Sequence, residues 1–336
     1  MKSVNLGSQG LRVPAIGLGC MGMSDFYGSS SQAENLRVLD RAVDIGCTFW
    51  DTSDIYGPFT NEILLSKSLK GRRDQIILAT KFGVSRGEDG SWLGIKGNAD
   101  YVKACCDASL KRLGTDYIDL YYQHRVDPET PIEETVGAMA ELVEAGKVRY
   151  IGSSTAPAWK VMEAVLMSGL KGYVRFVSEQ PPYNLLDRRI ENELVPMCQA
   201  HGLGIFPWSP LAMGILAGRY ADADDYPADS RANLRGGIYA ERITARGIEV
   251  GNRVVHLARE RGISPAQLAV LWVKDQPGVT APLIGPRTVE QLEQMLPVLE
   301  MELDAETRQA CDELVPPGSA AANFHNSAPW MKMRVL

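Results

Sequence analysis

The chain has 336 residues, of which 45% are hydrophobic and 23% are charged, as in an ordinary globular protein. Its net charge of −6 argues against a nucleic-acid partner or an anionic membrane. The N-terminus lacks the apolar core of a secretory signal, no apolar run approaches the about 20 residues that span a bilayer, and the six cysteines form no C-x-x-C pair. We therefore expect a cytoplasmic protein with reduced thiols and no metal site.

The chain begins with residues 2–15, where two short alternating runs around a glycine-rich turn predict a β-hairpin. Residues 16–22 then match the dinucleotide-binding pattern G-x-G-x-x-G, but that pattern must open directly into a helix. Here the helical pattern starts only at Gln32. We therefore interpret 16–19 as a first strand whose glycines let the backbone pass close to a ligand.

Strands and helices alternate through the rest of the chain. The expected strands are 16–19, 47–51, 76–81, 117–123, 148–153, 174–180, 203–208 and 279–284. The expected helices are 32–45, 61–69, 99–113, 132–145, 157–169, 190–201, 241–261, 265–274, one from 288, and 304–314. Eight strands joined by helical crossovers predict a (β/α)8 TIM barrel.

We expect this barrel to form one domain over residues 1–336. The barrel itself occupies about 16–300, the hairpin precedes it, and a C-terminal helix and tail follow within 301–336. Two segments, 82–97 and 213–240, are expected to be irregular. The second segment is longer than a loop that only connects two elements usually is, so it is a candidate binding loop.

Polar residues end three successive strands. Asp51 ends the second, Lys81 the third and His124 the fourth, while Tyr56 lies in the loop after Asp51. The carboxyl ends of barrel strands meet at one mouth, and neighbouring strands lie roughly 5 Å apart. We therefore expect these four side chains to cluster.

The four side chains suit the reduction of a carbonyl group by hydride, because the resulting alkoxide needs a proton and charge stabilisation. Tyr56 could donate the proton, and a charged Lys81 could lower the pKa of Tyr56. Asp51 could keep Lys81 charged, and His124 could donate a hydrogen bond to the carbonyl oxygen. Alone, each could be a structural residue; their coincidence at strand ends favours catalysis. The neighbouring Ser53 and Asp54 are expected only to shape the loop.

A second group of residues follows the eighth strand. Gly285 lets the backbone approach a ligand, Thr288 and the N–H groups of the next helical turn suit an anion, and Arg287 adds positive charge. This pattern predicts a phosphate site, where an arginine favours the 2′-phosphate of NADP over NAD. The alternative is an arginine that packs beside a helix cap.

Several residues between these groups could hold a nicotinamide. Trp208, at the end of the seventh strand, could stack on the flat ring or could be a core residue. Ser154, Thr155 and Gln180 end the fifth and sixth strands and could bind the carboxamide.

The chain resembles the aldo-keto reductases, and its motifs resemble most those of the bacterial and plant branch of the family. The resemblance lies in residues 18–23, 51–57, 80–83, 122–127, 208–211, 284–287 and Gln291. It implies an NADP(H)-dependent, reversible reduction of an aldehyde or ketone, with Asp51, Tyr56, Lys81 and His124 as the catalytic tetrad. It also implies cofactor contacts at Gly19, Met21, Asp51, Ser154, Gln180, Trp208, Ser209, Leu211, Gly285, Arg287 and Gln291.

The chain departs from the family pattern at two positions. Thr155 replaces a frequent asparagine, and Met295 stands where the family often has an asparagine that contacts adenine. Substrate choice in the family comes from variable loops, here 24–30, 82–97, 213–240 and the tail. Plausible pocket walls in these segments are Phe26, Trp92 and Trp330.

The sequence is also compatible with two alternative functions. The family also includes channel-associated subunits, so a nucleotide-sensing binding module is one alternative, and NADP-dependent alcohol oxidation is another. A metal-dependent barrel hydrolase is disfavoured, because three of the four histidines fall on expected helices or the tail. We expect a small carbonyl or alcohol substrate and a monomer or weak homo-oligomer.

Overall fold

The computed structural model describes residues 1–24, 27–28, 30–87 and 89–325. Within these residues, eight parallel strands lie side by side in chain order. They are β3 (Gly17–Gly19), β4 (Phe49–Asp51), β5 (Ile77–Phe82), β8 (Ile118–Gln123), β9 (Val148–Ser154), β10 (Ser178–Gln180), β11 (Gly204–Ile205) and β12 (Leu283–Ile284). The strand β12 pairs with β3, and a bridge between Ile205 and Val279 joins β11 to the segment before β12. The predicted (β/α)8 barrel is therefore confirmed.

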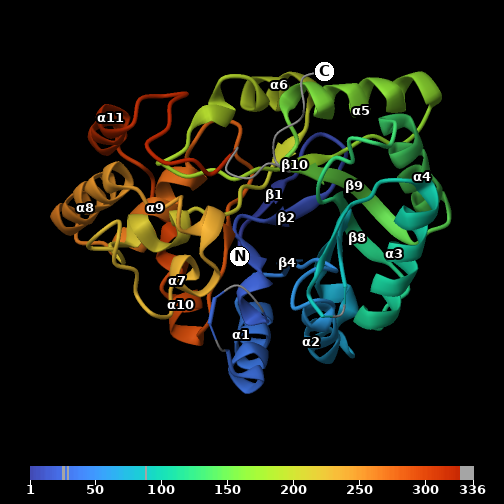
Figure 1. The fold of residues 1–336 in the computed structure, drawn as a ribbon, viewed down its shortest axis with the longest axis horizontal. Helices are drawn as coiled ribbons and strands as arrows, with labels where there is room; N and C mark the ends of the chain where they lie inside the picture. Colours follow the sequence, from blue (N-terminus) through green and yellow to red (C-terminus); the bar gives the residue numbers. More distant parts are fainter. Residues whose placement is uncertain (25–26, 29, 88, 326–336) are drawn as a thin grey trace.

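Helices surround these strands (Figure 1). They are α1 (Gln32–Asp44), α2 (Thr60–Leu69), α3 (Ala99–Leu113), α4 (Ile132–Glu144), α5 (Ala158–Lys171), α6 (Leu194–His201), α7 (Arg231–Arg235), α8 (Ala245–Glu260), α9 (Pro265–Lys274), α10 (Val289–Glu293) and α11 (Ala305–Leu314). Capping side chains set several starts: Asn98 accepts a bond from the Tyr101 amide at 2.9 Å, and Ser264 forms a capping box with Gln267. No helix in the described ranges is long and apolar enough to cross a bilayer.

The strands separate two apolar cores. Successive strand residues point to opposite faces, so Trp50 packs in the outer core beneath the helices while its neighbour Phe49 packs inside the barrel. Inside, the Phe49 ring stacks on that of Phe206 at 4.3 Å between centroids. The interior is thus filled by side chains and forms no open pore.

The predicted N-terminal hairpin is confirmed and closes one end of the barrel. Its strands β1 (Ser3–Asn5) and β2 (Arg12–Pro14) are antiparallel. The Ser8 amide donates to the carbonyl of Gly202 at 2.9 Å, next to the amino end of β11. At Gly7, where φ is 67°, a Cβ atom would lie 2.6 Å from the carbonyl oxygen of Val177. The hairpin therefore covers the amino ends of the strands and leaves the carboxyl ends for a site.

Two segments expected to be irregular contain regular structure. Residues 82–97 include an antiparallel hairpin of β6 (Val84–Arg86) and β7 (Trp92–Ile95), because the glycine-rich turn between them brings the Gly87 amide to the carbonyl of Ser91 at 2.9 Å. Residues 213–240 contain short helical turns and α7, which Ser230 caps by accepting from the Asn233 amide.

The sixth, seventh and eighth strands of the barrel are shorter than expected. The expected helix 190–201 is divided into a 3-10 turn, Arg189–Glu191, and α6. Ion pairs join Arg188 to Glu191 and Arg189 to Asp187 at that turn.

Candidate active site

A cavity of about 960 Å³ opens at the carboxyl ends of the barrel strands. This volume is at the upper end of the usual range for ligand pockets. Most site residues predicted from the sequence line the cavity: Gly19, Met21, Asp51, Tyr56, His124, Ser154, Gln180, Trp208, Ser209, Leu211, Gly285, Arg287 and Gln291. Lys81, Thr155 and Thr288 are not among its lining residues. Lys81 is completely buried and lies against Tyr56 at the wall of the cavity.

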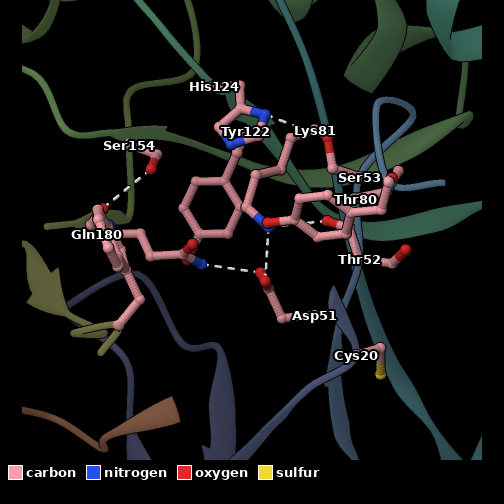
Figure 2. A network of polar contacts seen from close by, with 12 residues as sticks. Cys20, Asp51, Thr52, Ser53, Thr80, Lys81, Tyr122, His124, Ser154 and Gln180 are labelled. Carbon is pink, nitrogen blue, oxygen red and sulfur yellow. Dashed lines mark hydrogen bonds and ion pairs between the residues drawn. The ribbon is translucent and has the colours of Figure 1, made fainter. Parts of the chain in front are cut away.

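Lys81 joins Asp51 to Tyr56. Its Nζ atom lies 2.5 Å from Oδ1 of Asp51 and 2.8 Å from the carbonyl oxygen of Thr52 (Figure 2). It also lies 3.3 Å from the Tyr56 hydroxyl. An ammonium group has three hydrogens to donate, and these three oxygens can accept all of them. Because Tyr56 accepts from Lys81, the hydrogen of its own hydroxyl group is not used in that bond.

Burial and charge act in opposite directions on these groups. Burial alone lowers the pKa of Lys81, but the Asp51 carboxylate and Tyr56 outweigh it, so the pKa lies above its usual value and Lys81 stays charged. Burial raises the pKa of Asp51, and Lys81 opposes that rise.

The pKa of Tyr56 differs from the sequence-based expectation. Lys81 does favour the phenolate, as expected, but burial has the larger effect and the net pKa is raised above the usual value. The physical reason is that loss of water destabilises a phenolate more than the nearby ammonium stabilises it. Tyr56 is therefore protonated at neutral pH.

His124 follows β8 directly and is neutral. Burial, then the charges of Arg125 and Lys81, hold its pKa well below the usual value. Its ring is edge-on to that of Tyr56, with 6.0 Å between centroids. The Nδ1 atom lies 3.1 Å from Oγ of Ser53, and Figure 2 shows the second ring nitrogen on the side away from Ser53.

The contact between Ser53 and His124 was not predicted, because Ser53 was expected only to shape the loop. A local signal for it exists in the sequence. Ser53 comes two residues after Asp51, and the two-residue period of extended chain places alternate side chains on the same side. The rest of the contact depends on the position of β8, which the local sequence does not specify.

Among the residues predicted to hold a carboxamide, Gln180 contacts the tetrad directly. Gln180 donates from Nε2 to Oδ2 of Asp51 at 2.8 Å, and Ser154 donates from Oγ to the Gln180 carbonyl at 2.9 Å. Thr155 lies in the left-handed region with φ of 55°, and its hydroxyl accepts from Nε1 of Trp208 at 3.3 Å. These contacts fix the wall of the cavity beside Asp51.

The turn after β12 differs in part from expectation. The Arg287 amide donates to Oε1 of Gln291 at 2.8 Å, the Gln291 amide donates to the Thr288 hydroxyl at 3.2 Å, and the Val289 amide donates to Oε1 of Glu34 at 3.2 Å. Several N–H groups that we expected to bind an anion are therefore bonded to protein oxygens. The Arg287 side chain lines the cavity from this turn and brings a positive charge to it.

Residues 15–316 match the model of the aldo/keto reductase family. The chain belongs to this family. It is 37% identical over 332 residues to aldo-keto reductase yakc of Schizosaccharomyces pombe, whose name carries NADP(+), with 95% of this chain and 96% of that protein covered. It is 38% identical over 324 residues to probable aldo-keto reductase 1 of Glycine max, with 96% and 91% covered.

The predicted resemblance is thus confirmed, and the aldo-keto reductase family implies an oxidoreductase that uses NAD(P)H on carbonyl groups. The cavity of this reductase fits such a cofactor. At Gly19, a Cβ atom would lie 3.4 Å from the carbonyl oxygen of Ile284, so a side chain there would narrow the floor of the cavity. Gln180 and Ser154 line the cavity, and Arg287 lines it from the turn after β12.

Sequence reasoning missed further arginines in the cavity wall of this aldo-keto reductase. They are Arg86, Arg125, Arg219, Arg231 and Arg242. Arg219 pairs with Asp229 at 2.5 Å. Two of the five lie in the candidate binding loop 213–240, so the basic residues of that loop were a usable signal. Of the three predicted aromatic walls, Trp92 lines the cavity, whereas Phe26 and Trp330 lie outside the described residues.

Proposed function

We propose that this aldo-keto reductase reduces an aldehyde or ketone with NADPH, reversibly, and that Tyr56 donates the proton. The observation that carries the proposal is the contact of Lys81 with both Asp51 and Tyr56, beside the neutral His124, at one end of a single cavity. Bound NADPH supplies the hydride.

The side chains divide the remaining work. The Tyr56 hydroxyl gives its proton to the carbonyl oxygen as negative charge develops there. The Lys81 ammonium, 3.3 Å from that hydroxyl, stabilises the phenolate that is left. Asp51 holds Lys81 in place and charged, and His124 donates a hydrogen bond to the same substrate oxygen.

Other residues of the cavity would hold the cofactor. Ser154 and Gln180 would bind its carboxamide, and Trp208 would stack on its nicotinamide ring. Arg287 would bind the 2′-phosphate, since a guanidinium matches a phosphate in shape and charge. The remaining assigned contacts are Gly19, Met21, Asp51, Ser209, Leu211, Gly285 and Gln291.

The test is NADPH oxidation with a panel of aldehydes and ketones, together with NADP reduction by the matching alcohols. We expect turnover in both directions and a loss of roughly 10²- to 10⁴-fold in kcat for Tyr56→Phe, with NADPH binding retained. Tyr173→Phe is the matched control, because Tyr173 is half-buried and does not line the cavity. Full activity of Tyr56→Phe contradicts the proton-donor role. Binding of NADPH without turnover of any compound favours the binding-module alternative.

A further inference from the structure

Three side chains form a buried hydrogen-bonded chain that ends at His124. Oγ of Ser53 lies 3.1 Å from Oδ1 of Asp54 on one side and 3.1 Å from Nδ1 of His124 on the other. All three residues are buried, with exposed fractions of 3% for Asp54, 0% for Ser53 and 6% for His124. Water therefore does not replace any link of this chain.

The number of hydrogens in the chain allows two arrangements. Ser53 has one hydroxyl hydrogen, and the neutral ring of His124 has one N–H. If Asp54 is protonated, it donates to Ser53, Ser53 donates to Nδ1, and the His124 proton is on Nε2. If Asp54 is ionised, Ser53 donates to Asp54, Nδ1–H donates to Ser53, and Nε2 is left as an acceptor.

The backbone around Ser53 is compatible with both arrangements. The Ile55 amide also donates to Oγ of Ser53, at 3.5 Å. A hydroxyl oxygen can accept two bonds and donate one, so Ser53 makes three bonds in either case. The state of Asp54 therefore decides the direction of the chain.

We propose that Asp54 and Ser53 are positioning residues that determine which ring nitrogen of His124 carries the proton. The inference rests on the proposed function in one respect, the role of His124 as a donor to the substrate oxygen. Only the Nε2–H tautomer can donate from the ring nitrogen that lies away from Ser53. The other tautomer presents a lone pair to an oxygen that is becoming negative.

The surroundings of Asp54 set the pH at which it ionises, and therefore the pH at which the His124 tautomer changes. Burial and the carboxylate of Glu62 raise the pKa of Asp54 to about 8, against the smaller opposing effects of Ser53, Arg112 and the Ile55 amide. The titratable and charged groups that face it are Glu62 from α2, Tyr101, Cys105 and Arg112 from α3, Tyr121 from β8, and Arg86, which donates to the Ile55 carbonyl. Asp54 is thus protonated at neutral pH and ionised in moderate alkali.

Histidine 15N NMR tests the proposal without any turnover, because the two ring nitrogens differ in chemical shift according to which one is protonated. The full chain is labelled on histidine, which occurs four times, and His124→Gln identifies the resonance of interest. In the wild type we expect the Nε2–H tautomer at about pH 6.5 and the Nδ1–H tautomer at about pH 9.5. A single tautomer across this range overturns the proposal.

Asp54→Asn is the decisive variant. An asparagine amide can donate to Ser53 at every pH, so we expect the Nε2–H tautomer throughout. In the reduction reaction, we expect the kcat/KM of the wild type to fall about tenfold per pH unit above the pKa of Asp54, which amounts to about 30-fold by about pH 9.5. Over the same pH range the kcat/KM of the variant should change by no more than about threefold. If the variant keeps both the tautomer change and the fall in kcat/KM that the wild type shows, the proposal is overturned. If no carbonyl is turned over at all, the proposed function fails while the NMR result still decides the tautomer.

Two further variants separate the proposed chain from general effects of buried acids. Glu62→Gln removes a charge that raises the pKa of Asp54 and does not touch Ser53, so the tautomer change moves to lower pH. Glu179→Gln removes another buried carboxyl, with a pKa of about 7, that bonds to Ser153 and the Ala156 amide. We expect this variant to leave the pH midpoint of the His124 tautomer change where it is in the wild type. The proposal is contradicted if Glu62→Gln does not shift the pH midpoint of the tautomer change, or if Glu179→Gln does shift it.

Discussion

The amide nitrogen of Gln180 lies 2.8 Å from Oδ2 of Asp51, the carboxylate whose other oxygen bonds to Lys81 (Figure 2). Because a carboxylate can only accept, this bond orients the amide, with its nitrogen toward Asp51. The carbonyl oxygen of the amide is then an acceptor that Gln180 can offer to a bound carboxamide. One residue therefore supports the ion pair and forms part of the wall where we expect the nicotinamide.

Replacing Gln180 by methionine tests this double role. Gln180→Met keeps the side-chain length but leaves Oδ2 of Asp51 buried without this donor, so we expect a loss of about 1–3 kcal/mol in the free energy of unfolding. We also expect weaker NADPH binding. Urea unfolding and cofactor titration measure the two effects. Gln276→Met is the control, because Gln276 is also buried but donates to the carbonyl of Trp272. Loss of stability with unchanged cofactor affinity in Gln180→Met contradicts the cofactor contact.

The dependence of stability on pH tests the state of Asp54. Its folded-state pKa is raised from 3.8 to about 8, so between these values the folded chain holds a proton that the unfolded chain has released. The contribution to stability is present below the unfolded value and is lost as pH rises toward the folded value, at a rate of at most roughly 1.4 kcal/mol per pH unit.

Asp54→Asn removes that titration. We expect the stability of the variant relative to the wild type to improve between about pH 5 and about pH 8, as measured by urea unfolding at both values. A constant difference between the two proteins shows that Asp54 is already ionised in the folded state at about pH 5.

The choice between NADPH and NADH tests Arg287. Arg287→Ala should weaken NADPH binding by about 10- to 100-fold, because it removes a charge-assisted hydrogen bond, and should leave NADH binding nearly unchanged. Parallel titrations with both cofactors measure the ratio. Arg246→Ala is the control, since Arg246 pairs with Glu249 on the surface of α8 and does not line the cavity. An equal ratio in wild type and Arg287→Ala rules out the phosphate assignment.

The left-handed backbone at Thr155 makes a prediction about stability. A β-branched residue at φ of 55° is strained, and asparagine tolerates this region better. We expect Thr155→Asn to raise the free energy of unfolding by about 1 kcal/mol. Thr155→Val keeps the strain and removes the acceptor of Trp208, so it should be less stable than the wild type. If both variants are destabilised to the same degree, the hydroxyl contact outweighs the strain.

The sequence by itself determined the order of strands and helices, the barrel and the identity of the polar residues at its mouth. These features depend on local properties. Apolar runs such as 76–81 mark buried strands, and parallel connection places Asp51, Lys81 and His124 at the same end of the barrel.

Only the tertiary structure decided how these side chains meet and how they are charged. The bonds of Gln180 to Asp51 and of Ser53 to His124 join different strands, so their lengths depend on barrel closure and register. The net pKa of Tyr56 depends on how completely packing removes water, an effect that exceeds the charge of Lys81 and that no local pattern contains. For the same reason Asp54, which the sequence presents as a loop residue, is in the folded chain a buried acid that is linked to His124 through Ser53.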